Sequence, residues 1–178
     1  MIIFDLDGTL ADCEHRRHYV QPYEKRWVDE ENHYGKEFKG QCGYHYFNKD
    51  GTLWSNKPDW KAFYEACDKD EPIIPMLEIN GGCLEMGKHI EIWSGRCESV
   101  REKTVDWLDY NMFSYRALKM RPIGDHTPDD ELKERWLKEA LAEGKTIEYV
   151  FDDRPKVIRK WREHGIFVFN CAQSDREF

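Results

Sequence analysis

Short apolar segments alternate with amphipathic segments along most of the chain. The apolar segments at 1–4, 89–93, 147–151 and 166–169 have the length and the β-branched and aromatic content of strands. A weaker segment of the same kind covers 115–120. Because strands that alternate with helices form parallel sheets with right-handed crossovers, the pattern predicts an α/β fold.

Between these segments, apolar residues recur at helical spacing in three stretches, which we interpret as core-facing helix surfaces. They are Val100, Thr104, Trp107 and Leu108; then Leu132, Trp136, Ala140 and Leu141; then Val157, Ile158 and Trp161. We expect Thr127 to cap the second helix, with Pro128 in its first turn and Gly144 at its end. Pro155 opens the third helix and Gly165 closes it.

The segment from about 22 to 58 interrupts the alternation. Aromatic runs at 44–47 and 52–54 flank Asn48-Lys49-Asp50-Gly51, and an Asp-Gly turn between such runs predicts a hairpin. We interpret 22–58 as a cap-like insertion in a single domain that covers 1–178. Helical character returns at 59–87, although the pair Gly81-Gly82 disfavours one continuous helix there.

Composition narrows the class of protein. At 178 residues the chain is long enough for one α/β domain with a core. A formal charge of −8 disfavours unaided tracking along a nucleic-acid backbone, so any such contact is expected to be local. No apolar run approaches the roughly 20 residues of a membrane span, and 1–4 is too short for a signal peptide. We therefore expect a cytoplasmic protein with no membrane partner, and no obligatory protein partner is indicated.

The six cysteines show no CxxC pair and no regular spacing, which favours reduced, mostly buried thiols over a disulfide framework. Cys42 and His45 lie close in sequence, with His33 upstream, and this group is the alternative candidate for a metal site. Polar residues of a loop or hairpin explain it better, because a second ligand pair is missing.

Acidic and hydroxyl residues follow several of the predicted strands, at the sheet edge where α/β proteins place their chemistry. Asp5 and Asp7 are two residues apart, and like charges this close are costly unless a cation neutralises them. Magnesium suits carboxylate ligands, and Asp152 and Asp153 supply the rest of an acidic cluster. A carboxylate can also attack phosphorus.

These motifs resemble those of the haloacid dehalogenase (HAD) superfamily: Asp5-Leu6-Asp7-Gly8-Thr9-Leu10, then Ser94, then Lys133, then Asp152-Asp153. The stretches 93–96, 124–133 and 151–154 are similar, more narrowly, to the 3'-phosphatase domain of phage polynucleotide kinase. The resemblance implies a HAD-like Rossmannoid parallel sheet with helices on both faces and a small inserted cap. It covers nearly the whole chain outside 22–58.

The resemblance also implies catalytic roles. Asp5 would attack phosphorus, and Asp7 would protonate the leaving oxygen and later activate water. Mg²⁺ would be held by the Asp5 carboxylate, the Asp7 main-chain carbonyl and Asp152, with Asp153 in support. The transferring phosphoryl group would be held by Ser94 and Lys133.

Substrate-binding roles follow from the same resemblance. The residues expected to contact substrate or its phosphate are Thr9, Gly95, Arg96, Arg16 and Asp129. Arg16 lies nine residues after Asp7, and Asp129 lies four residues before Lys133, as in the polynucleotide branch.

Plainer interpretations stay open for several of these residues. Arg16 and Arg96 are also explained as solvated surface arginines, and Lys133 as a solvated helix residue. Asp129 is also explained as an acid that stabilises a helix first turn. The aromatic hairpin is equally consistent with stacking on a base and with a cap packed on its own body.

The sequence thus predicts a Mg²⁺-dependent phosphomonoesterase that works through an aspartyl-phosphate, with a nucleotide or nucleic-acid 3' end as substrate. The alternative substrates are free nucleoside 5'-monophosphates or another small phosphoester. Two further classes remain: a non-catalytic nucleotide-binding module and an interaction protein that recruits a partner through the hairpin.

Overall fold

A computed structural model describes residues 1–28, 43–54 and 57–172. These residues divide into two compact units, one formed by Met1–Cys13 with Tyr64–Phe178 and the other by Glu14–Phe63. The predicted insertion at 22–58 lies within the second unit. Its role as a cap stays a prediction.

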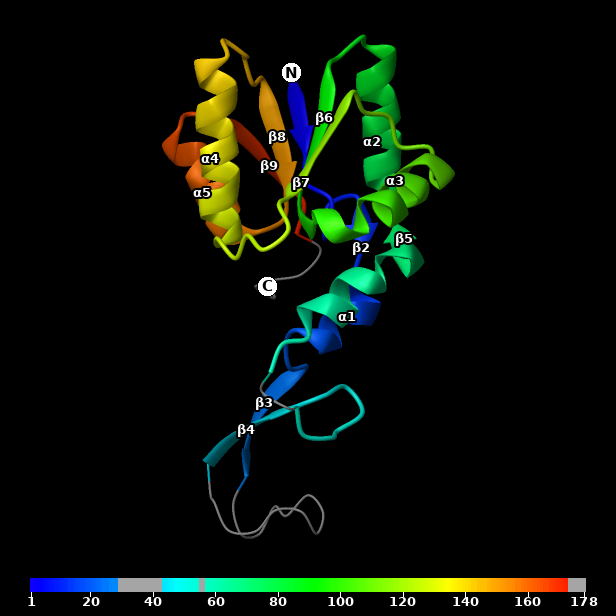
Figure 1. Ribbon diagram of the computed structural model, residues 1–178, viewed down its shortest axis with the longest axis vertical. Coiled ribbons are helices and arrows are strands. Elements are labelled where there is room, and N and C mark those ends of the chain that lie inside the picture. Colours follow the sequence, from blue (N-terminus) through cyan, green and yellow to red (C-terminus); the bar gives the residue numbers. More distant parts are fainter. Residues whose placement is uncertain (29–42, 55–56, 173–178) are drawn as a thin grey trace. The chain divides into compact units, whose positions relative to one another are not determined.

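The first unit is built on a five-stranded sheet in the order β7-β6-β1-β8-β9, with every neighbouring pair parallel (Figure 1). The strands are β1 (Ile2–Phe4), β6 (Ile90–Cys97), β7 (Ala117–Arg121), β8 (Tyr149–Asp152) and β9 (Phe167–Asn170). All five segments predicted as strands are therefore confirmed. β6 continues four residues beyond the predicted end at Trp93, and this extension carries Ser94, Gly95 and Arg96.

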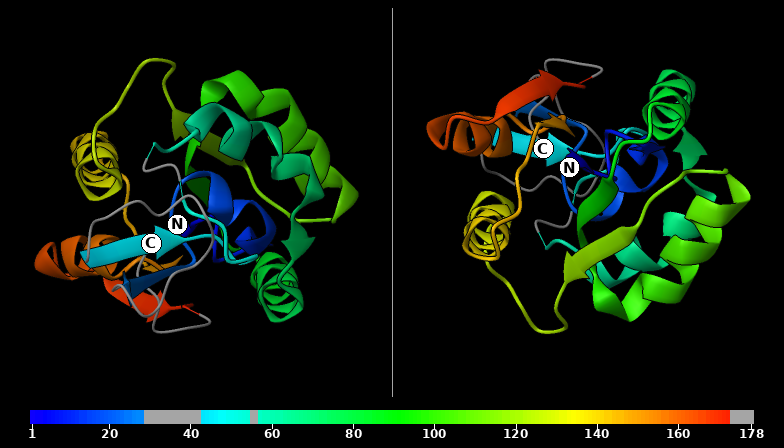
Figure 2. Two further views of the ribbon diagram at one scale, coloured as in Figure 1. Left: turned by 90° about the horizontal axis from the view of Figure 1, so that it is seen from below. Right: turned by 90° about the horizontal axis from the view of Figure 1, so that it is seen from above.

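Alternate residues of the central strand pack into two separate cores, one on each face of the sheet. Ile2 and Phe4 belong to a cluster with residues of α2 (Ile74–Glu85) and α3 (Arg101–Tyr110). Ile3 belongs to a second cluster with residues of α4 (Asp129–Ala142) and α5 (Pro155–Glu163). Figure 2 shows the two pairs of helices on opposite sides of the sheet. Helices on both faces were predicted, and the structure confirms them.

Two details of the helix predictions are wrong. α4 begins at Asp129 with Pro128 in the N-cap position and no side-chain capping bond. The main-chain N–H of Thr127 instead donates to Asp125 Oδ1 at 2.9 Å. Leu141 is 45% exposed, because α4 turns this position away from the core while Leu137 is buried. Gly144 and Gly165 end their helices with φ of +77° and +73°, as predicted.

The stretch 59–87 contains more than helix. α1 (Trp60–Glu65) and a 3₁₀ turn (Cys67–Lys69) precede the short strand β5 (Glu71–Pro72), which pairs antiparallel with β2 (Ala11–Asp12). α2 then runs unbroken through Gly81 and Gly82, contrary to the expectation that the two glycines disfavour a continuous helix.

The second unit contains a 3₁₀ helix (Glu14–Tyr19) and an antiparallel pair of strands, β3 (Glu24–Val28) and β4 (Gly43–Phe47). The predicted turn after β4 is present: the Gly51 N–H donates to Asn48 O at 3.0 Å, and Gly51 has φ +83°. Beyond this turn, Leu53 forms only an isolated bridge with Phe47. The main partner of β4 is β3, which the hairpin prediction missed.

None of the helices in the described part of the chain combines the length and apolar content that a membrane span needs. Cysteines 13, 67, 83, 97 and 171 are free thiols. Cys42 and His33, two members of the alternative metal group, lie outside the described residues.

Candidate active site

The ammonium of Lys133 lies among three carboxylates at the carboxyl edge of the sheet. Its Nζ is 2.8 Å from Asp5 Oδ1, 2.9 Å from Asp152 Oδ2 and 3.6 Å from Asp129 Oδ2. Asp5 follows β1, Asp152 ends β8, and Lys133 and Asp129 lie one turn apart on α4. Lys133 is 1% exposed, so its interpretation as a solvated helix residue is wrong.

The burial of these charges shifts their pKa values in opposite directions. Burial raises the pKa of Asp5 well above its usual range; Lys133 opposes this shift, and the nearby carboxylates of Asp152 and Asp153 add to it. Burial alone would lower the pKa of Lys133, but Asp152, Asp5 and Asp129 outweigh it and raise the value. Lys133 is therefore a fixed cation at neutral pH, and further positive charge beside Asp5 would favour its ionised form.

Asp5, Asp152 and Asp153 each offer a carboxylate oxygen, and these oxygens lie within 4.8 Å of one another. Burial, followed by the charge of Asp152, raises the pKa of Asp153 to about 6. Asp153 Oδ1 is buried with no hydrogen-bond partner among the described residues. An orphaned buried oxygen within a cluster of oxygen donors fits Mg²⁺, which binds one or two carboxylates and completes its shell with water and phosphate oxygens.

Asp7 is held by Arg96 instead of joining the carboxylate cluster through its side chain. Nε and NH2 of Arg96 donate to Asp7 Oδ1 at 2.8 and 2.5 Å. The same NH2 lies 2.5 Å from Oδ2 of Asp70, and the side chains of Arg96 and Asp70 are both fully buried. Arg96 is therefore a structural bridge between two acids and not a solvated surface residue. The proposed contact of the Asp7 carbonyl with Mg²⁺ stays a prediction.

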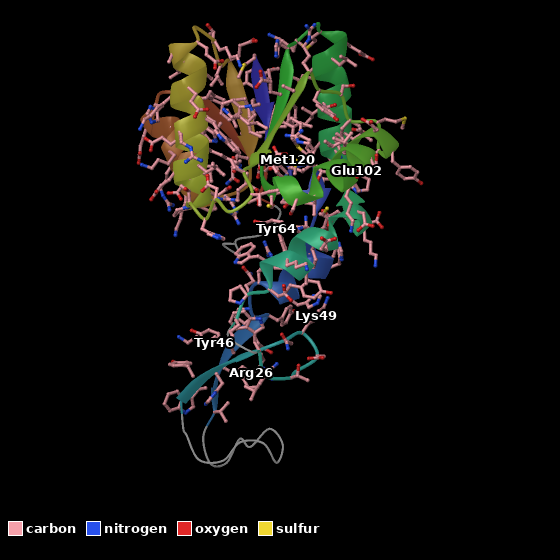
Figure 3. All side chains as sticks on the ribbon, in the orientation of Figure 1. Arg26, Tyr46, Lys49, Tyr64, Glu102 and Met120 are labelled. Atoms are coloured by element: carbon pink, nitrogen blue, oxygen red, sulfur yellow. The ribbon has the colours of Figure 1, made fainter. Side chains whose placement is uncertain are left out.

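The end of β6 is shaped by its neighbours. Ser94 is fully buried, and its Oγ accepts the Arg96 N–H at 3.1 Å. A Cβ on Gly95 would lie 2.4 Å from Asp129 Oδ1, so only glycine fits while Asp129 keeps its position. The Gly95 carbonyl accepts Arg121 Nε at 3.0 Å and the Tyr64 hydroxyl at 3.4 Å; Tyr64 is labelled in Figure 3.

Asp129 does more than stabilise the first turn of α4. Its carboxylate lies 3.2 Å from Arg121 NH2 and 3.3 Å from Arg154 NH1, besides its contact with Lys133. Burial raises its pKa, but Lys133, Arg154 and Arg121 together outweigh that effect and lower the value. Asp129 is thus an ionised acid that holds three cations.

Thr9 and Arg16 are the other two residues predicted to bind substrate. Thr9 is fully buried, and its Oγ1 has no hydrogen-bond partner among the described residues. Arg16 belongs to the second unit, where its NH1 donates to Phe63 O at 3.2 Å and its guanidinium lies 4.1 Å from the centre of the Phe63 ring. Arg16 is buried, so the surface interpretation is wrong, whereas its contact with substrate stays a prediction.

Sequence reasoning assigned no role to Asp70 and left Arg121 and Arg154 without one. Asp70 follows a 3₁₀ turn outside every motif, and no spacing signals it. Arg154 follows Asp152-Asp153 directly, so its position next to the fourth motif was the available signal. Arg121 ends β7, where the carboxyl edge of a parallel sheet would have indicated a site residue.

Residues 45–176 match the family model described as the polynucleotide kinase PNKP phosphatase domain. This chain belongs to that family. The PNKP phosphatase match includes Ser94, Lys133 and Asp152, but it begins after Asp5 and Asp7. β1 pairs with β6 on one side and β8 on the other, so the two acids that follow β1 lie next to the matched strands.

One curated relative supports the PNKP phosphatase assignment. A protein of Autographa californica nuclear polyhedrosis virus, described as "Putative bifunctional polynucleotide kinase/RNA ligase", is 30% identical over 138 residues, which cover 72% of this chain and 19% of that protein. This chain therefore spans about a fifth of that relative.

Solved structures share the fold. A chain of the Pnkp1/Rnl/Hen1 complex has a TM-score of 0.64 at 22% identity, covering 95% of this chain and 44% of its own. A putative phosphatase from Clostridium difficile has a TM-score of 0.56 at 18% identity, covering 95% and 83%. Together with the family match, these findings make the chain a HAD-type phosphatase related to polynucleotide kinases.

Proposed function

We propose that this chain is a Mg²⁺-dependent phosphomonoesterase that removes the 3'-phosphate from nucleotides or polynucleotide ends through an aspartyl-phosphate. The observation that carries the proposal is the position of Asp5. Its carboxylate lies 2.8 Å from the buried ammonium of Lys133 and belongs to a cluster of three carboxylates. Asp7, two residues further on, is held by Arg96.

In the first step, a carboxylate oxygen of Asp5 attacks phosphorus and the bond from phosphorus to the 3' oxygen breaks. Asp7 gives its proton to that leaving oxygen. In the second step Asp7 takes a proton from water, the water oxygen bonds to phosphorus, and the bond to Asp5 breaks to release inorganic phosphate.

The remaining residues position and neutralise the phosphoryl group. Lys133 has three N–H donors, and Asp5 and Asp152 can take two of them. The third donor can then reach a phosphoryl oxygen next to Asp5. The Ser94 hydroxyl, held by the Arg96 N–H, can donate to a second oxygen. Mg²⁺, when bound to Asp5, Asp152 and Asp153, would supply the positive charge that this acidic cluster lacks.

The test is phosphate release, with Mg²⁺, from 3'-phosphorylated and 5'-phosphorylated oligonucleotides and from free 3'- and 5'-mononucleotides. We expect release from 3' ends by the wild type and its loss in Asp5→Asn, which keeps the size of the side chain. Release from free 5'-mononucleotides alone would overturn the 3'-end assignment. Equal turnover by Asp5→Asn on every substrate would overturn the mechanism.

A further inference from the structure

One face of the β3–β4 ribbon carries three exposed aromatic rings and one lysine. The antiparallel register pairs Lys25 with Tyr46 and Trp27 with Tyr44. Because side chains alternate between the two faces of a strand, these four residues share one face. Trp27, Tyr44 and Tyr46 are 54%, 62% and 38% exposed. Figure 3 labels Tyr46 on this ribbon.

The four side chains contact one another. The rings of Trp27 and Tyr44 have their centres 5.2 Å apart at an angle of 79°. Nζ of Lys25 lies 4.4 Å from the centre of the Tyr44 ring and 5.8 Å from that of Tyr46. The ammonium is thus held over the rings by cation–π attraction, which presents an aromatic surface together with a positive charge.

Charge and aromatic residues are distributed unevenly along the chain. Residues 14–63 contain nine Lys and Arg against eight Asp and Glu, a formal charge of +1, whereas the rest of the chain carries −9. The same segment holds 11 of the chain's 25 aromatic residues in less than a third of its length. The surface with the exposed rings is therefore also the part of the chain that repels a polyanion least.

We propose that this face, defined by Lys25, Trp27, Tyr44 and Tyr46, binds single-stranded nucleic acid. Bases of the strand stack on Trp27 and Tyr44, and Lys25 contacts a neighbouring phosphate. Stacking requires exposed base faces, so the surface selects single strands over duplexes. The inference rests on the proposed function for its substrate class: the strand that binds here is one that ends in the phosphate to be removed.

A protein partner is the other occupant that exposed Tyr and Trp residues suggest. The lysine held over the rings favours the nucleic acid, because it supplies a phosphate contact at the centre of the surface. Among the described residues, no carboxylate forms an ion pair with Lys25, although ion pairs are common elsewhere on this acidic chain.

The experiment measures binding of a fluorescently labelled, 3'-phosphorylated oligothymidylate to the full chain by anisotropy. All proteins carry Asp5→Asn, so turnover does not interfere. Trp27→Ala and Tyr44→Ala should each weaken binding by about 5- to 150-fold, and Trp27→Phe should restore most of the affinity. The matched control is Tyr110→Ala, an 87% exposed aromatic residue of the first unit, which should leave the Kd unchanged. Lys25→Gln should lower the slope of log Kd against log salt by about 0.7.

Unchanged Kd values in both alanine variants, or equal binding of a duplex, would overturn the proposal. Steady-state kinetics with proteins that keep Asp5 then separate the binding proposal from the proposed function. With the ribbon variants, kcat/KM should fall more for a 3'-phosphorylated oligonucleotide than for a free 3'-mononucleotide. If no phosphoester is hydrolysed but Trp27→Ala still weakens strand binding, the catalytic proposal fails and the binding proposal stands. If both substrates are hydrolysed and the ribbon variants change neither, the binding proposal fails alone.

Discussion

Asp70 offers a direct test of whether the buried bridge through Arg96 positions Asp7. The carboxylate of Asp70 lies 2.5 Å from Arg96 NH2, and both side chains are fully buried. Asp70→Asn keeps an oxygen acceptor and nearly the same volume but removes the charge that faces the guanidinium. A charge-assisted hydrogen bond contributes about 1.5–3 kcal/mol to the free energy of unfolding, so we expect a loss in that range.

For a chain of this length, about 2–4 °C of Tm is lost per kcal/mol, so the melting temperature should fall by about 3–12 °C. Asp70→Ala removes this partner of Arg96 altogether, and loss of one partner of a buried ion pair costs about 3–5 kcal/mol. Because Nε and NH2 of Arg96 also donate to Asp7, misplacement of the guanidinium should reduce kcat by up to about 100-fold with a smaller change in KM.

The assay is urea unfolding, followed by near-UV circular dichroism, together with steady-state phosphate release. Asp68→Asn is the matched control, because Asp68 is an exposed acid in the same 3₁₀ turn and the substitution removes the same charge. It should change neither the stability nor kcat. An Asp70→Asn protein with wild-type stability and wild-type kcat would refute the reasoning, since Arg96 would then hold Asp7 without help from Asp70.

Three further predictions concern the acidic cluster and the end of β6. Without divalent cations, the free energy of unfolding should fall as pH rises from about 4 to about 6. The reason is the raised pKa of Asp153: over this range the folded protein binds a proton that the unfolded chain has released. Urea titrations should show this slope, and Asp153→Asn should flatten it. Mg²⁺ at 100 times its Kd should add about 2.7 kcal/mol of stability, and calorimetry should find little of this gain in Asp152→Asn; an equal gain in both proteins would place the ion elsewhere. Gly95→Ala should reduce kcat, because its Cβ would lie 2.4 Å from Asp129 Oδ1, whereas Gly82→Ala, with open space around it, should retain full activity; equal activity of the two variants would contradict the packing argument.

Part of this fold was predictable because its signals are local. Asp5, Ser94 and Asp152 each follow a short apolar run that predicts a strand, and a parallel sheet gathers such residues at its carboxyl edge. The structure brings Asp5, Lys133, Asp129 and Asp152 together, as their joint assignment to one site requires.

Other features depend on contacts that leave no local signal. Asp70 reaches Arg96 from a turn between two elements, so only the tertiary fold relates them. The partner of β4 is β3, which precedes it by more than ten residues in the sequence. The Asp-Gly turn signal at 50–51 instead favoured pairing with 52–54. Leu141 fits the apolar spacing of α4 yet lies beyond the edge of the core, since periodicity gives a face but not where the covering layer ends.

The central claim is that Asp5 becomes phosphorylated, and rapid acid quench followed by mass spectrometry tests it most directly. Wild-type protein mixed with Mg²⁺ and a 3'-phosphorylated oligonucleotide should gain the mass of one phosphoryl group, located by peptide mapping at Asp5, and Asp5→Asn should gain none. A phosphoryl group on a different residue, or phosphate release by Asp5→Asn at the wild-type rate, would contradict the account.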